Sequence, residues 1–112
     1  MIPVVYELGK TRLLKLDFRA IIKLEAIFGS PMTKWQLDAL TFSEIANILA
    51  ESMRLETKDI TTEDVIDLIE NHSDYQEAFE KAYECITAAF AKNVPAVKKA
   101  PPKVKVENGT GK

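Results

Sequence analysis

The segment LDFRAIIKLEAIFG, residues 16–29, is the most apolar stretch of the sequence, and the predicted fold is built around it. Its apolar residues keep helical spacing, and both of its ends carry residues typical of helix boundaries. Asp17 can accept a hydrogen bond from a free backbone N–H at the start, and Gly29 suits the left-handed conformation that closes many helices. We therefore expect a central helix here, with the rest of the chain packed around it.

The apolar surface of this helix is wider than packing against a single core requires. Two adjacent stripes each hold three apolar residues, namely Ile21, Leu24 and Phe28 on one and Phe18, Ile22 and Ala26 on the other. Either several elements surround the helix, or part of it contacts another chain.

The composition is that of one small globular domain followed by a basic tail. Of the 112 residues, 46% are apolar and 29% are charged. Residues 1–91 hold nine Lys or Arg and sixteen Asp or Glu, for a charge of −7, whereas residues 92–112 hold six Lys and one Glu, for +5; together they give −2. The tail is rich in Lys and Pro and lacks aromatic residues, so we expect a single domain over 1–92 and a disordered segment over 93–112.

The single cysteine, Cys85, rules out an intrachain disulfide and a thiolate zinc cluster, and it favours a reducing compartment. Residues 1–7 lack the features of a signal peptide, and no stretch approaches the roughly 18 apolar residues of a membrane span. These features predict a soluble cytoplasmic protein with no membrane partner.

Two alternating runs precede the first helix. Val4, Tyr6 and Leu8 form one set of alternate positions, and residues 11–16 alternate again after Gly9. This pattern predicts a β-hairpin with a two-residue turn in which glycine takes the first position. Because two strands alone are marginal in water, the hairpin should pack on the helices or join the edge of a neighbour.

Further helices are predicted after residue 30. A short helix with irregular ends is expected over 32–40, and Thr41 with Glu44, and Thr61 with Asp64, are capping boxes that open the next two helices. Residues 73–76 open the longest helix, whose expected packing face holds Tyr75, Phe79, Ala82 or Tyr83, Ile86 and Phe90. The predicted fold is α+β, mainly α, with an N-terminal β-hairpin, a small bundle of four to five helices and a disordered basic C-terminal tail.

The sequence predicts no catalytic, metal or cofactor site. His72 is the only histidine and is expected in a solvated loop, and Cys85 is expected as a small buried hydrophobe. Glu63, Asp64 and Asp67 suit the first turn of a helix, and no histidine or glycine-rich calcium loop accompanies them. We therefore do not expect an enzyme.

Trp35 has two interpretations. It is either a core residue under the second helix or, with Met32 and Phe42, part of an exposed apolar patch where a partner docks. Nucleic acid is not an expected specific partner, because the folded part is acidic and Arg19 and Lys23 are too few for a groove-binding cluster.

Residues 14–29 and 40–49 resemble the tail assembly chaperones of long-tailed bacteriophages and related tail-like particles. The resemblance lies in a strand followed by a helix that ends in Leu-Glu-x-x-x-Gly, here Leu24, Glu25 and Gly29, and then a helix that begins at Thr or Ser. It covers residues 4–91 and rests on the spacing of apolar residues.

The resemblance implies a non-catalytic, self-associating protein of the bacterial cytoplasm that is absent from the finished virion. It would cover the tape-measure protein while tail-tube subunits polymerise around it, and the tail-tube protein is a second implied partner. We expect Phe18, Ile22, Trp35 and Phe42 to border the surface that contacts protein partners. Many such systems make a longer product by ribosomal frameshifting, with which the pair Lys98-Lys99 is compatible. Two alternatives remain open: a small helical DNA-binding or transcription-regulating protein, and a structural virion component such as a head–tail connector.

Overall fold

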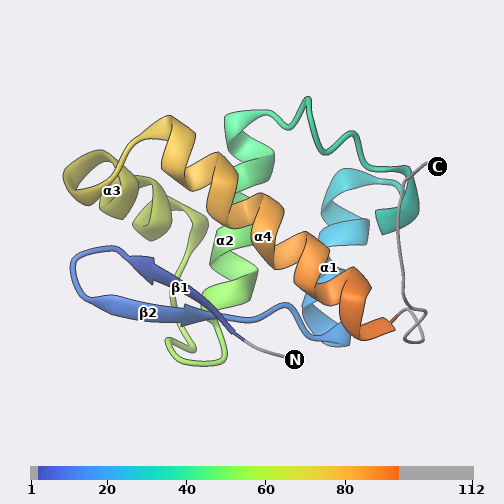
Figure 1. Ribbon diagram of the computed structural model, residues 1–112, viewed down its shortest axis with the longest axis horizontal. Helices are drawn as coiled ribbons and strands as arrows, with labels where there is room; N and C mark the ends of the chain where they lie inside the picture. The colour runs from blue at the N-terminus through green and yellow to red at the C-terminus, as the bar shows by residue number, and fades with distance from the viewer. Residues whose placement is uncertain (1–2, 94–112) are drawn as a thin grey trace, which may run out of the picture.

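The computed structural model describes residues 3–93, with side chains described up to residue 90. A two-stranded antiparallel hairpin precedes four α-helices and one short 3₁₀ turn (Figure 1). The elements are β1 (Val4–Glu7), β2 (Thr11–Leu14), α1 (Phe18–Phe28), η1 (Met32–Lys34), α2 (Phe42–Met53), α3 (Thr62–His72) and α4 (Tyr75–Asn93). The predicted α+β, mainly α fold is confirmed. From residue 94 on, the predicted disordered tail lies outside the described residues.

The hairpin is confirmed, but its predicted two-residue turn is wrong. Val5 pairs with Leu13 and Glu7 with Thr11, so three residues, 8–10, join the strands. Leu8 lies outside the ladder with its side chain fully buried, and its N–H donates to the Lys10 carbonyl at 2.9 Å. Gly9 between them takes φ 79°, which glycine adopts without steric cost.

The hairpin packs on the helices through its inner face. β1 lies against α4 and β2 against α2. Tyr6 is buried, and its hydroxyl hydrogen-bonds the Ser73 hydroxyl at 2.7 Å, just before α4 begins. The backbone N–H of Lys15 donates to the carbonyl of Ser52 at 2.9 Å. These contacts supply the packing that two strands lack on their own.

The central helix of the fold is α2, and the prediction that residues 16–29 occupy that place is wrong. α2 packs against α1, α3, α4 and β2, whereas the main contacts of α1 are with α2. In Figure 1, α4 crosses in front of α2, with the hairpin and α3 on one side and α1 on the other. Eight of the twelve residues of α2 are buried: Ile45, Ala46, Ile48, Leu49, Ala50, Glu51, Ser52 and Met53. Its small residues let neighbours approach from several sides, which apolar content alone does not reveal.

The predicted helix boundaries are confirmed where capping signals mark them. Asp17 accepts a hydrogen bond from the N–H of Ala20 at 2.8 Å, and Gly29 closes α1 at φ 73°. Both capping boxes form, one at Thr41 and the other at Thr61, with the hydroxyl and the acidic side chain bonding in both directions. Asp74 accepts from the N–H of Glu77 at 2.8 Å at the start of α4.

The predicted packing face of α4 is wrong in part. Tyr75 and Tyr83 are exposed, at 55% and 43%. Ala82 and Ile86 are buried as predicted, and the rest of the buried face is formed by Ala78, Cys85 and Ala89. The three alanines, four and seven residues apart, present little bulk, so α4 lies close to α2. The two tyrosines turn outward, whereas Phe79 and Phe90 are half-buried and pack against the core.

Candidate protein-binding surfaces

The outward face of α1 carries the most exposed apolar residue among the predicted contact residues. Ile22 is 64% exposed and Phe18 one turn earlier is 57% exposed, although Leu24 in the same helix is fully buried. Ala26, one turn after Ile22, is also exposed. Residues four apart lie on one side of a helix, so these three form a continuous apolar stripe along the side opposite the core. We call Phe18, Ile22 and Ala26 the α1 stripe.

Trp35 lies at a different place from the α1 stripe. Its ring packs edge-on against Phe28, with centroids 4.9 Å apart, and its indole N–H donates to the Ser30 carbonyl at 3.1 Å. Trp35 is half-buried, beside the short turn η1 that replaces the predicted irregular helix. Phe28 belongs to the core-facing side of α1, so Trp35 secures the connection between α1 and α2.

Phe42 lies at the start of α2 and is half-buried. Its ring contacts Tyr75 at the start of α4, with centroids 5.4 Å apart. The structure thus brings together Phe18 and Ile22 of the four predicted contact residues, and it places Trp35 and Phe42 at two other contacts.

A second outward surface, on α4, was missed by the sequence analysis. Phe79 and Tyr83 lie one turn apart with ring centroids 6.2 Å apart, and Glu80 and Glu84 line the same shallow hollow. We call these four residues the α4 surface. Phe79 is half-buried and packs against the core as predicted, whereas Tyr83 is exposed. The alanine spacing in the same helix is the signal that favours Ala82 over Tyr83 as the core residue.

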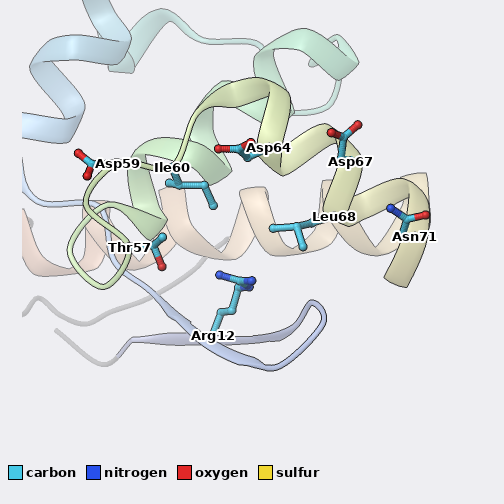
Figure 2. A pocket seen from close by; sticks show the side chains of 8 residues that line it. All are labelled: Arg12, Thr57, Asp59, Ile60, Asp64, Asp67, Leu68 and Asn71. Carbon is cyan, nitrogen blue, oxygen red and sulfur yellow. The ribbon is translucent and has the colours of Figure 1, made fainter.

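A cleft of about 480 Å³ separates the hairpin from α3 (Figure 2). Arg12 reaches into it from β2, and its Nε donates to the Leu8 carbonyl at 2.8 Å. On the opposite wall, Figure 2 shows Leu68 toward Arg12 and the carboxylate of Asp67 directed away from it. Asp64 is already engaged as an acceptor in the capping box. Within the described residues, no three His, Cys, Asp or Glu side chains gather closely enough to hold a metal ion.

The titratable side chains of Cys85, His72 and Tyr6 lie in three different surroundings. Burial raises the pKa of the Cys85 thiol to about 12, and a hydrogen bond with Ser52 offsets only part of that effect. Cys85 therefore stays protonated near neutral pH, in the form that is a poor nucleophile. His72, expected in a loop, is the last residue of α3 and is exposed. Burial also raises the pKa of Tyr6, whose hydroxyl takes part in a structural chain through Ser73 to Glu77.

Comparison of the chain with protein families, curated proteins and solved structures gives no match. None of the helices in residues 3–93 combines the length and apolar character needed to cross a membrane.

Proposed function

We propose that this protein is a tail assembly chaperone of a bacteriophage, a prophage or a related tail-like particle. It acts without catalysis, by binding the tape-measure protein reversibly while the tail tube is built. The proposal rests on the resemblance of residues 4–91 and on one structural observation, the apolar stripe on the outward face of α1.

The α1 stripe supports a binding role because it lies where a solitary domain would place polar side chains. Ile22 is 64% exposed at the centre of a helix whose opposite side already fills the core. Contiguous exposed apolar surface is typical of protein interaction sites. A tape-measure protein consists of long amphipathic helices, and such a helix can cover the stripe with its own apolar side.

Reversible binding to the tape-measure protein would explain why this protein is expected in the cytoplasm and not in the finished particle. An uncovered tape-measure helix would aggregate, so the chaperone is needed in the bacterial cytoplasm and is displaced once the tube encloses its partner. The tail-tube protein is the second proposed partner, and self-association would let several copies cover one long helix.

Co-expression with the tape-measure protein tests this function. We expect the tape-measure protein to be insoluble alone and soluble when wild-type chain is present, and the two to purify together. Phe18→Ala with Ile22→Ala should abolish co-purification, whereas Thr33→Ala, at an exposed residue of η1, should leave it unchanged. A tape-measure protein that stays insoluble with wild-type chain would refute the proposal.

Immunoblots with an antibody to residues 1–91 separate the alternatives. A chaperone should appear in induced cells and be missing from purified particles, and a second, larger band would reveal a frameshifted product. Retention in particles would indicate a structural virion component. Duplex DNA binding that survives removal of residues 93–112 would indicate a regulator.

A further inference from the structure

Two outward helix surfaces repeat one side-chain pattern with opposite charge. In α1 an apolar residue is followed by a basic one, and both recur four residues later. In α4 an aromatic residue is followed by an acidic one, and this pair of residue types also recurs four residues later. The corresponding segments are Phe18-Arg19 and Ile22-Lys23, then Ala26, on α1, and Phe79-Glu80 and Tyr83-Glu84, then Thr87, on α4.

The charged residues of both patterns are available for a partner. Arg19, Lys23, Glu80 and Glu84 are all exposed. Within the described residues, neither Arg19 nor Lys23 forms an ion pair. Glu80 accepts a hydrogen bond from Gln76 at 3.0 Å, and Glu84 lies 3.9 Å from the Lys81 ammonium. Both of these are exposed contacts along one helix, which contribute little and are readily exchanged.

We propose that α1 of one copy of this chain packs against α4 of a second copy, with the two helices antiparallel. The α1 stripe, chiefly Ile22 and Ala26, would cover Tyr83, which is exposed, and the accessible part of Phe79, which is half-buried and also packs against its own core. A charged residue one position after an apolar one lies on the same flank of each helix, because both helices have the same hand. When the helices run antiparallel, these flanks meet on one side of the contact, so Arg19 and Lys23 face the two glutamates. A parallel arrangement would put them on opposite sides.

The contact joins two different surfaces, so it is heterologous. Each copy keeps a free α4 surface at one end and a free α1 stripe at the other, and such contacts continue into rings or open chains. An 11-residue helix is about 16 Å long at 1.5 Å per residue, so the contact is small and association should be weak and concentration-dependent. The inference concerns the protein alone and does not depend on the proposed function, in which a tape-measure helix would displace α4 of the second copy from the same α1 stripe.

Charge reversal tests the contact in purified full-length protein by sedimentation velocity up to millimolar concentration. Wild type should rise in average mass above the 12.6 kDa monomer as concentration increases. Arg19→Glu with Lys23→Glu makes both surfaces acidic, and Glu80→Lys with Glu84→Lys makes both basic. Each variant alone should associate at least roughly tenfold more weakly, because like charges then face each other. Mixing the two should restore association, since acidic and basic copies alternate.

A matched pair of variants controls for net charge. Lys10→Glu with Lys34→Glu and Asp38→Lys with Glu70→Lys reverse exposed charges elsewhere and produce the same changes, from −2 to −6 and from −2 to +2. Each should self-associate like wild type. Circular dichroism of all four variants establishes that they are folded.

Three results would overturn the proposal: a wild-type protein that stays monomeric at millimolar concentration, a charge-reversed pair that associates as wild type does, or a mixture that fails to restore association. Tape-measure binding without self-association would thus contradict this contact and leave only the tape-measure binding of the proposed function supported.

Discussion

Two alanine substitutions two positions apart in α1 should have opposite consequences. Leu24 is fully buried, whereas Ile22 is 64% exposed. Truncating a buried leucine to alanine costs about 2–5 kcal/mol of unfolding free energy, through lost burial and the cavity left behind. For a domain of this size each kcal/mol lowers the melting temperature by about 4–8 °C, so a mid-range loss of about 3 kcal/mol lowers it by about 12–24 °C.

Ile22→Ala should change the unfolding free energy by less than about 0.5 kcal/mol. The substitution removes little buried surface, and alanine is the better helix former, so the two small effects oppose each other. The same substitution removes the centre of the α1 stripe and should weaken association with other chains. Leu24→Ala should leave association intact at temperatures where the variant is folded.

Thermal unfolding followed by circular dichroism measures the first effect, and sedimentation of the same samples measures the second. A melting temperature that falls as far in Ile22→Ala as in Leu24→Ala would refute the assignment of an outward and an inward side to this helix. Intact association in Ile22→Ala would instead refute the role of the stripe.

Three further substitutions test local features of the fold. Gly9→Ala should destabilise more than Gly29→Ala in urea unfolding: both force a positive φ that costs about 1–2 kcal/mol, but a Cβ at Gly9 would also lie 3.2 Å from His72 Nε2, whereas Gly29 has nothing within 4 Å. Equal losses of unfolding free energy in the two variants would show that the His72 side chain moves aside without an energetic cost. Thr41→Ala should cost about 1 kcal/mol by removing the cap of the central helix, and an unchanged denaturation midpoint would contradict that role. Cys85 should resist thiol reagents at pH 8 until the protein unfolds. Because its folded pKa is raised from 9.0 to about 12, its contribution to stability is complete below pH 8 and is lost between pH 9 and 12. Cys85→Ala should remove this fall in unfolding free energy between pH 9 and 12. If the unfolding free energy of wild type and of Cys85→Ala fell equally over that range, the raised pKa of Cys85 would be contradicted.

The helix boundaries could be predicted because their causes are local. A cap involves a side chain and a backbone group three residues away, as Thr41 and Glu44 illustrate, and a left-handed closing residue needs only glycine at the right place. The hairpin is similarly local, although its turn is one residue longer than predicted because Leu8 lies outside the ladder.

The packing of the helices could be predicted only in part. Ile86 of α4 is buried as predicted, but Tyr83 faces outward, and Ala78 and Ala89 complete the buried side. Hydrophobicity favours large apolar side chains as core residues, whereas the close packing of α4 on α2 requires small ones such as alanine. For the same reason the central position of α2 was not predicted from sequence, because two of its buried residues, Ala46 and Ala50, are small.

The candidate protein-binding residues were also only partly predictable from the sequence. The width of the apolar arc on residues 18–28 left two alternatives, several surrounding elements or a contact with another chain, and the structure leaves Phe18 and Ile22 exposed. Trp35 and Phe42 could not be placed from sequence, because their positions depend on Phe28 and Tyr75, which belong to other helices.

By itself, the sequence determined the hairpin, the four α-helices with their capped ends and the wide apolar arc of α1, since these follow from interactions within a few residues. Only the tertiary structure decided which helix is central, which side of α4 is buried and which charged residues stay free beside exposed apolar ones. Those outcomes depend on how closely distant segments approach, and that distance is set by the whole packed core.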